Sequence, residues 1–519
     1  MERYFNITGC CNPGEHYMVN LDSRLAQIKK MIDRGQYFCI NRGRQYGKTT
    51  MLKALSNYLI ENYIVISMDF QKDMSSLDYE KENYFCVSFG HIFGDALKKL
   101  KFVNTESIKS MMEQMQFWGE RFGFVRLFRE ISKICLSSEK PIVLIIDEVD
   151  SASNNQVFLD FLAQLRGYYL ERNEQPTFQS VILAGVHDIR NLRQKIRPDA
   201  EHKHNSPWNI ASSFDVDMSF NVSDIAGMLE DYEKDHHTGM DIMEISQLVY
   251  DYTSGYPVLV SSFCAYMDKI NDWTINGILE ANKELLISRT PLFESLIGKL
   301  EDNESLRKLL YVILFYGKKI PYNPDDSTID SAYMYGFVKN ENGMIAVANR
   351  VFEVRIYNWF ISLETTESLM YSEGANDKNQ FITGNQLNME KVLEKFIVHF
   401  NDIYGNQPDK FKEEDGRKLF LLYLRPIING TGNYYIESHT RDQRRTDVIV
   451  DYAGKQYIIE LKIWRGDEYN TEGEKQLSQY LDYYHIDKGY LLSFNFNKNK
   501  KTGMKTVNIN GKTVIEAVV

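Results

Sequence analysis

The first 200 residues alternate between short apolar runs and stretches in which apolar residues return every three or four positions. The run QYFCI at 36–40 is typical of a buried strand, and the spacing from Met51 to Leu59 predicts a helix soon after it. The run PIVLIID at 141–147 is continuously apolar, which predicts a strand covered on both faces, as in a parallel sheet. A third run, SVILAG at 180–185, repeats this pattern. The N-terminal part is therefore predicted to be an α/β domain.

The middle of the chain, 221–363, has mostly helical periodicity. Ser223 is a candidate helix cap, and 304–317 is strongly amphipathic. The dipeptide Asn342-Gly343 favours a type I′ turn and predicts a two-stranded wing. Helices with a wing suggest a winged-helix unit. A lid that packs on the N-terminal domain is the favoured alternative, because no basic recognition helix is visible.

The next stretch, 364–386, loses periodicity and collects Ser, Gly, Asn and Asp, which predicts a linker. The charge balance also changes near this point. Residues 381–519 contain 20 Lys and Arg against 19 Asp and Glu, whereas the whole chain has a net charge of -11. The acidity therefore lies in residues 1–380, and it argues against a protein that coats nucleic acid without specificity.

Two alternating runs near the C-terminus, TDVIVDY at 446–452 and KQYIIELKIW at 455–464, flank Ala453-Gly454. This arrangement predicts a β-hairpin. If the turn is centred on those two residues, Asp447 lies directly opposite Glu460. Because side chains alternate along a strand, Glu460 also shares a face with Lys462.

Length and composition favour a globular protein of several domains. The chain has 519 residues, of which 43% are hydrophobic and 13% aromatic, and this length allows roughly three domains. No apolar run is long enough to span a membrane, and the N-terminus lacks the pattern of a secretory signal. The six cysteines, including the adjacent pair Cys10-Cys11, have no metal or disulfide spacing. We expect a cytoplasmic protein with no membrane partner.

The segment NRGRQYGKTT, 41–50, ends in the Gly-Lys-Thr of a phosphate-binding loop. Such loops surround phosphates with backbone N–H groups, while Lys contacts the β- and γ-phosphates and the hydroxyl binds Mg²⁺. Arg42 stands where the first glycine of the pattern is expected. The alternative is a helix start that happens to contain Lys-Thr-Thr. The predicted strand before it and helix after it favour the loop, since a helix N-terminus attracts phosphate.

The acids that follow the strand at 141–147 supply the second element of an ATPase. Asp147 is expected at the carboxyl end of a parallel strand, where such sheets bind ligands. Glu148 is placed to polarise the attacking water. The alternative is a buried strand that ends in a solvated acidic turn.

A basic segment follows the third strand. His187, Arg190, Arg193 and Arg197 recur at a spacing that shares one helical face. Arg190 or Arg193 could sense the γ-phosphate or reach the nucleotide of a neighbouring subunit, and so favour a homo-oligomer. The alternative is a solvated helix face.

The C-terminal hairpin would bring two carboxylates and a lysine together. Asp447 and Glu460 suit Mg²⁺, and a bound metal activates water for phosphodiester hydrolysis while Lys462 orients the nucleophile or offsets charge. The alternative is an exposed hairpin face with an ordinary Glu/Lys pattern. Gln476 and Tyr480 lie one turn apart on a predicted helix that follows.

Three arginines just before Asp447 could clamp a phosphate backbone, namely Arg441, Arg444 and Arg445. Together with the acids, they indicate nucleic acid as the partner. DNA is favoured over RNA as the expected substrate.

These motifs resemble known families. The hairpin with Asp447, Glu460-Leu-Lys462 and the following Gln476-x-x-x-Tyr480 is similar to the PD-(D/E)XK nuclease superfamily. The segments RGRQYGKTT, VLIIDEVD, SPWNIASSF and MYGFVKNENG resemble the AAA-like ATPase module that is fused to such nucleases in bacterial proteins. That module keeps an arginine-containing loop, R-[RQ]-x-G-K-[ST], so Arg42 need not abolish nucleotide binding.

The resemblance implies roles for individual residues. The nucleotide and its Mg²⁺ would be bound by Arg44, Gly47, Lys48, Thr49, Thr50 and Asp147, with Glu148 as the catalytic base. The nuclease centre would comprise Asp447 and Glu460 as metal ligands with Lys462. The acid that the nuclease family carries on its first helix has two candidates, Glu414 and Glu437.

The resemblance also implies an α/β fold in several parts. A P-loop ATPase domain with a parallel sheet is expected at 1–220, a helical and winged-helix domain at 221–363, a linker at 364–386, and a restriction-endonuclease-like α/β domain at 387–519. The expected function is an ATP-regulated, Mg²⁺-dependent nuclease in defence or mobile-element biology. The alternative is a nucleotide switch without hydrolysis, whose C-terminal fold only binds nucleic acid or protein.

Overall fold

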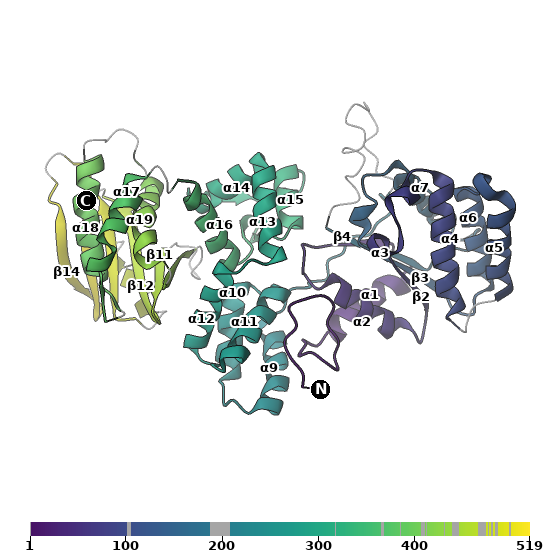
Figure 1. Ribbon diagram of the computed structural model, residues 1–519, viewed down its shortest axis with the longest axis horizontal. Helices are drawn as coiled ribbons and strands as arrows, with labels where there is room; N and C mark the ends of the chain where they lie inside the picture. Colours follow the sequence, from purple (N-terminus) through teal and green to yellow (C-terminus); the bar gives the residue numbers. More distant parts are fainter. Residues whose placement is uncertain are drawn as a thin grey trace. The chain divides into compact units, whose positions relative to one another are not determined.

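The computed structural model (Figure 1) describes residues 2–100, 105–186, 208–316, 318–364, 368–384, 386–405, 411, 413–429, 431–437, 446–464, 474–475, 477–478, 481–482, 486–497 and 500–519. The chain divides into two compact units. Unit 1 comprises Met1–His236, Tyr256–Ser261 and Met334–Gly336, and unit 2 comprises His237–Gly255, Ser262–Tyr333 and Phe337–Val519.

The described part of unit 1 contains a four-stranded parallel sheet with the order β1-β4-β3-β2. Its strands are β1 (Phe38–Asn41), β2 (Ile64–Asp69), β3 (Ile142–Asp147) and β4 (Ser180–Gly185). Every residue of β3 and β4 is buried. The continuous apolar runs therefore form central strands covered on both faces, as predicted.

Helices cover both faces of this sheet (Figure 1). They are α1 (Asp22–Asp33), α2 (Lys48–Leu59), α3 (Phe70–Asp73), α4 (Glu82–Lys98), α5 (Thr105–Trp118), α6 (Phe124–Ser137) and α7 (Gln156–Leu170). The helix α9 (Val222–His236) also belongs to unit 1, and its residues lie outside the two cores of the sheet. One core packs α1 and α2 against the sheet, and the opposite core packs α4 to α7 against its other face. This three-layer arrangement places the ends of β1 and β3 beside the start of α2.

The middle of the chain is helical, as predicted. Its helices are α10 (Ile242–Thr253), α11 (Pro257–Ile270), α12 (Ile275–Ile287), α13 (Pro291–Asp302), α14 (Glu304–Leu314), α15 (Ser327–Met334) and α16 (Arg350–Glu364). The predicted wing is present as β6 (Val338–Glu341) and β7 (Met344–Val347), to which β5 (Ile320–Pro321) adds a short third strand. Asn342 and Gly343 both have positive φ, at 52° and 82°, as a type I′ turn requires.

The expected linker at 364–386 is largely folded, so that prediction was wrong. It contains α17 (Leu369–Asp377), the short turn Lys378–Gln380 and β8 (Ile382–Thr383). Ser368 caps α17 by accepting a hydrogen bond from the Tyr371 N–H. Gly374 lets α17 approach α19 (Glu413–Ile428) closely, since a Cβ there would meet the Tyr423 carbonyl oxygen. Two of the small and polar residues that suggested a loop therefore have other roles: Ser368 caps a helix and Gly374 allows close helix packing. The expected boundaries at 220, 363 and 386 stay predictions.

The C-terminal part of unit 2 is a mixed six-stranded sheet in the order β10-β11-β12-β13-β15-β14. Its strands are β10 (Gly432–Glu437), β11 (Thr446–Tyr452), β12 (Lys455–Ile463), β13 (Lys488–Phe494), β14 (Gly503–Ile509) and β15 (Lys512–Val518). The helices α18 (Met389–Tyr404) and α19 (Glu413–Ile428) pack with α17 on this sheet, and β9 (Gln386–Leu387) pairs with β8 (Figure 1). The strands β12, β13 and β15 run parallel and end together near Lys462 and Ser493.

Within the described ranges, no helix is both long and apolar enough to cross a membrane. All six cysteines are free thiols.

Candidate functional site

The end of β3 meets the start of α2 through one direct contact. Thr49 Oγ1 donates a hydrogen bond of 2.8 Å to Asp147 Oδ2. Asp147 is the last residue of a fully buried strand, and its other oxygen accepts the Glu148 N–H at 2.9 Å. A hydroxyl beside a carboxylate is the oxygen pair that a Mg²⁺ ion uses at a phosphate-binding loop. The two residues therefore fit the metal that the sequence implied.

Lys48 is the first residue of α2, directly after the loop, and is buried. Its Nζ donates to the carbonyl oxygens of Arg42 at 2.9 Å and Gly43 at 3.0 Å. Burial lowers the pKa of the Lys48 ammonium, and the nearby Glu148 and Asp147 carboxylates oppose that shift. The Lys48 ammonium group thus lies against the backbone of the loop. A phosphate oxygen could replace the Arg42 or Gly43 carbonyl oxygen as its hydrogen-bond partner.

The backbone of the loop needs two left-handed residues. Gln45 has φ 55° and Gly47 has φ 79°, directly before α2 begins at Lys48. The conformation of Gly47 costs little backbone strain, because glycine adopts positive φ readily. Gly47 therefore ends the loop directly before the helix, and its predicted contact with nucleotide stays a prediction.

The Arg42 side chain makes its contacts outside the phosphate loop. Its guanidinium donates to the carbonyl oxygens of Asn41 at 3.0 Å and Val216 at 3.4 Å, and it lies 5.7 Å from the centre of the Phe214 ring. Its backbone N–H donates to the Gly185 carbonyl. The arginine in the place of the first glycine thus ties the loop to β4 and to the segment 214–216.

Position 43 of the loop has no room for a side chain, so packing requires a glycine there. A Cβ there would lie 2.5 Å from the Tyr335 carbonyl oxygen and 3.2 Å from the Tyr256 hydroxyl. That hydroxyl donates to the Arg44 carbonyl at 2.6 Å, and its ring packs against Tyr46. The sequence analysis gave no role to Tyr256 or Tyr335, although Tyr335 lies in the segment MYGFVKNENG and Tyr256 in the Gly-Tyr-Pro break at 255–257. The Arg44 side chain is exposed.

Glu148 follows β3 in a left-handed conformation, with φ 51°. Burial raises the pKa of its carboxyl, and the Asp147 charge adds to the effect while Lys48 opposes it. A carboxylate with a raised pKa is a better proton acceptor than an ordinary surface glutamate. The structure therefore brings together the proposed base, the metal-binding pair and the loop lysine.

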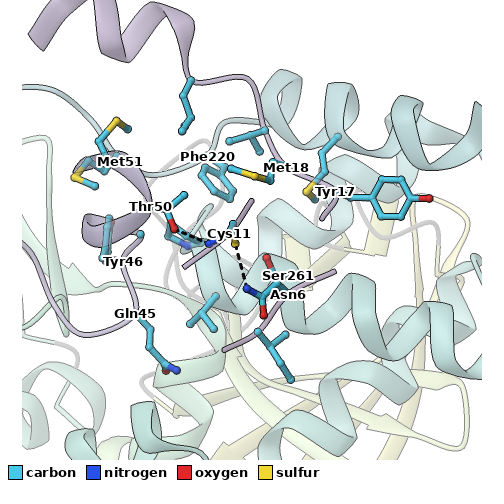
Figure 2. Close-up of a pocket in the computed structure, with 18 of the residues that line it drawn as sticks. Asn6, Cys11, Tyr17, Met18, Gln45, Tyr46, Thr50, Met51, Phe220 and Ser261 are labelled. Atoms are coloured by element: carbon cyan, nitrogen blue, oxygen red, sulfur yellow. Dashed lines mark hydrogen bonds between the residues drawn. The ribbon is translucent and has the colours of Figure 1, made fainter. Parts of the chain in front are cut away.

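A cavity of about 110 Å³ opens beside the loop and is lined mainly by apolar side chains (Figure 2). Thr50 forms part of its wall, and its Oγ1 accepts the Cys11 N–H at 3.1 Å. The Asn6 side-chain amide contacts Cys11 Sγ at 3.7 Å. The remaining lining comes from the N-terminal segment, the phosphate loop, α2, the segment 218–220, α9 and the start of α11: Ile7, Gly9, Tyr17, Met18, Val19, Leu21, Gln45, Tyr46, Gly47, Met51, Met218, Phe220, Met228, Pro257, Val258 and Ser261.

The C-terminal hairpin has the predicted turn and register. Ala453 and Gly454 both have positive φ, at 49° and 77°. The paired residues run from Tyr452 with Lys455 to Val448 with Ile459. The next pair in this register would be Asp447 with Glu460. Asp447 lies in β11, and its side chain is outside the described part of the structure.

Glu460 and Lys462 lie on one face of β12 and are 3% and 8% exposed. Their partners on the parallel strand β13 are Leu491 and Ser493. Because both side chains are buried, the alternative of an exposed hairpin face was wrong. Buried ionisable groups on one face of a sheet are typical of a functional site.

One further acid on this face was missed by sequence reasoning. Glu516 pairs with Leu491, which pairs in turn with Glu460, so the three residues form one row across the sheet. Glu516 is 1% exposed, and its carboxylate lies 2.7 Å from Lys505 Nζ. The alternation in KTVIEAV at 512–518 was the available signal, but it gave no reason to prefer this acid.

Several candidates fall outside the described part of the structure. They are the side chains of Glu414 in α19 and Glu437 in β10, together with His187, Arg190, Arg193, Arg197, Arg441, Arg444, Arg445, Gln476 and Tyr480. Leu477 and Leu481, from the predicted helix, would touch a Cβ built on Gly489. They therefore pack against the sheet beside Leu491. Among the described residues, no three His, Cys, Asp or Glu side chains gather into a metal-binding group.

Comparisons with known proteins agree with this geometry. Residues 15–354 match the family model of the AAA-like domain, and residues 433–507 match that of the PD-(D/E)XK nuclease superfamily. No curated protein matches the chain.

Among solved structures, a Walker-type ATPase of Pyrococcus abyssi is similar over 68% of this chain and 99% of its own, with 13% identity and a TM-score of 0.46. The ORC2 protein of Aeropyrum pernix is similar over 65% of this chain and 93% of its own, with 12% identity and a TM-score of 0.32. The family match extends over the phosphate loop, the end of β3 and the wing. The chain therefore belongs to the AAA-like domain family and carries a C-terminal PD-(D/E)XK nuclease superfamily domain.

Proposed function

We propose that the chain binds ATP and Mg²⁺ in unit 1, hydrolyses the ATP, and uses it to regulate Mg²⁺-dependent cleavage of DNA at the C-terminal hairpin. The contact between Thr49 Oγ1 and Asp147 Oδ2 carries the nucleotide half of this proposal. The hairpin register, with buried Glu460 and Lys462 on one face, carries the nuclease half.

In the nucleotide site, Lys48 would contact the β- and γ-phosphates, while Thr49 and Asp147 would hold Mg²⁺. Glu148 would accept a proton from the attacking water, which its raised pKa supports. The cavity beside Thr50 is the place that we propose for the purine, because it is apolar and directly adjoins the loop.

In the nuclease site, Glu460 and Asp447 would hold Mg²⁺, which when bound lowers the pKa of a water molecule. Lys462 would orient that nucleophile or stabilise the charge that develops on the phosphate. Glu414 or Glu437 would supply the further acid, with Gln476 and Tyr480 as bracing or substrate-contacting residues. The near-neutral charge of 381–519 supports contact between this part and DNA.

We further propose a cytoplasmic protein, in agreement with six free thiols, that acts in defence or mobile-element biology. A homo-oligomer that shares Arg190 or Arg193 between subunits is one route to regulation. Mass measurement with and without an ATP analogue tests it, and a monomer under both conditions argues against that route.

The purified full chain should be incubated with plasmid, single-stranded DNA and RNA, with Mg²⁺ or EDTA and with or without ATP. We expect cleavage of DNA that needs Mg²⁺ and that changes in rate with ATP. Loss of cleavage in Glu460→Gln would assign the activity to the hairpin. Binding of nucleotide and DNA without cleavage by the wild-type chain would favour the switch without nuclease activity.

A further inference from the structure

The helix α11 has its two ends in different compact units. Its first turn, up to Ser261, belongs to unit 1, and its remainder from Ser262 belongs to unit 2. An α-helix is held by hydrogen bonds along its length, and rigid secondary-structure elements carry energetic coupling between sites. Any displacement of its first turn is therefore passed to its later residues.

The start of this helix is attached to the nucleotide site. Tyr256 precedes α11 and donates its hydroxyl to the Arg44 carbonyl of the phosphate loop at 2.6 Å. The ring of Tyr256 is buried and lies 4.6 Å from that of Tyr46. In the first turn, Val258 and Ser261 line the cavity beside the loop. A ligand that moves the loop or fills the cavity must act on this end of α11.

The later part of α11 reaches the nuclease sheet through one tyrosine. Phe263 packs against Tyr252 of α10, with ring centres 5.6 Å apart. The Tyr252 hydroxyl lies 3.4 Å from Asp451 Oδ2 in β11, and both residues are buried. Asp451 stands four residues after Asp447 on the same strand. Asp451 pairs with Gln456, and Gln456 shares a face of β12 with Glu460 because the two are an even number of positions apart, so Tyr252 contacts the face that carries Glu460.

Other side chains surround the contact between Tyr252 and Asp451. Gln456 of β12 pairs with Asp451 across the hairpin, and the Gln456 side chain and the Arg350 charge at the start of α16 both favour the ionised Asp451 carboxylate. The Arg350 guanidinium lies 5.9 Å from the Tyr252 ring centre. Three elements thus converge on one carboxylate, so a shift of Tyr252 changes the support of β11 directly.

We propose that α11 transmits the nucleotide state from the phosphate loop to the nuclease hairpin, through Tyr256 at one end and the Phe263–Tyr252–Asp451 contacts at the other. Tyr256 and Tyr252 are positioning residues, since each acts through a neighbour. The inference rests on the proposed function and names how its regulation operates. Energetic coupling between two sites in proteins typically changes an affinity or population about fivefold or more.

The test uses the full chain and variants that remove single hydroxyls. Tyr252→Phe keeps the ring contact with Phe263 and loses the bond to Asp451. Tyr457→Phe is the matched control, because it removes a buried hydroxyl bond from the same sheet, to the Leu387 carbonyl. Asp451→Asn keeps an oxygen acceptor for Tyr252 and serves as the conservative variant.

Hydrogen exchange of the amides in β11 and β12 should be measured with and without a non-hydrolysable ATP analogue and Mg²⁺. In the wild type we expect the analogue to change exchange about fivefold or more. We expect Tyr252→Phe to bind the analogue with wild-type affinity and to lose this response, and Tyr457→Phe and Asp451→Asn to retain it. The ratio of DNA cleavage rates with and without ATP should approach one in Tyr252→Phe alone.

The outcomes separate this inference from the proposed function. An unchanged exchange response in Tyr252→Phe, or none in a wild type that binds the analogue, overturns the role of α11 whether or not DNA is cleaved. A wild type that fails to bind the analogue overturns both. A wild type with the exchange response but no cleavage keeps α11 as a transmitting helix and contradicts the nuclease activity.

Discussion

Thr49 Oγ1 lies 2.8 Å from Asp147 Oδ2, although 98 positions separate the two residues in the chain. The contact joins the first turn of α2 to the end of β3. It brings the two sequence motifs into contact, which neither motif could establish alone.

The lysine of the loop gives the first prediction. Lys48→Ala removes the charge held between the Arg42 and Gly43 carbonyls, and should weaken ATP binding by about 100-fold or more, because a phosphate contact by a charged group is lost. Lys53→Ala, on the exposed side of the same helix, is the control. Calorimetric titration measures both, and equal affinities would remove the loop assignment.

The hydroxyl of Thr49 gives the second prediction. Thr49→Val keeps the shape of the side chain and removes the oxygen that contacts Asp147, whereas Thr49→Ser keeps that oxygen. We expect Mg²⁺ to strengthen ATP binding in the wild type and in Thr49→Ser, and to have little effect in Thr49→Val. A titration with Mg²⁺ and with EDTA checks this. A full Mg²⁺ effect in Thr49→Val would contradict the assigned ligand.

Glu148 gives the third prediction. Glu148→Gln should retain nucleotide binding and reduce ATP turnover by about 100-fold or more, because the proton acceptor is lost. The base works when ionised, so turnover should fall as the pH decreases through its pKa. Since burial raises that pKa, the fall should begin at a higher pH than for an ordinary glutamate. Wild-type turnover in Glu148→Gln would mean that another group accepts the proton.

The fourth prediction concerns the nuclease face. Asp447→Ala, Glu460→Gln and Lys462→Ala should each reduce DNA cleavage by about 100-fold or more. All three should bind ATP as the wild type does, since these residues belong to unit 2. Lys455→Ala is the control, because Lys455 is an exposed lysine at the start of the same strand. Cleavage that survives both acid substitutions would place the active site elsewhere.

Asp451 gives the fifth prediction, a dependence of stability on pH. Burial raises the pKa of its carboxyl from 3.8 to about 6, although the Gln456 hydrogen bond and the Arg350 charge oppose this. The folded chain therefore holds a proton that the unfolded chain releases, and the free energy of unfolding should fall as the pH rises from about 4 to about 6.

Asp451→Asn removes this ionisation. It should raise the free energy of unfolding at pH 7.5 by as much as about 3 kcal/mol, from a pKa difference of about two units at 1.36 kcal/mol each, and by only about 1 kcal/mol near pH 4.5. Thermal unfolding of the full chain at both pH values checks this. An equal gain at both would show that the effect comes from packing and not from the charge.

Much of the fold followed from local pattern. The apolar runs at β3 and β4 and the turns at Asn342-Gly343 and Ala453-Gly454 each determine their own structure within a few residues. The hairpin register from Tyr452–Lys455 to Val448–Ile459 followed as well, because the turn sets the pairs that come directly after it. Elements of this kind are predictable since the residues that cause them are adjacent in the chain.

What the sequence did not reveal depends on contacts between distant segments. Tyr256 bonds the Arg44 carbonyl across 212 positions, and no local pattern marks a tyrosine for that contact. Glu516 resembles any other acid in an alternating strand until the sheet order places it in line with Glu460. The helix α17 was missed for a related reason, since its glycine serves the approach of another helix.

Gly43 also bears on how such chains can be recognised in genomes. Its missing side chain leaves room for the Tyr335 carbonyl and the Tyr256 hydroxyl, while Arg42 before it bonds the Val216 carbonyl. A search pattern that demands glycine at the position of Arg42 would pass over this protein. A pattern that accepts arginine there and requires glycine at the next position would find it, and would select for the tyrosine contacts as well as for the loop.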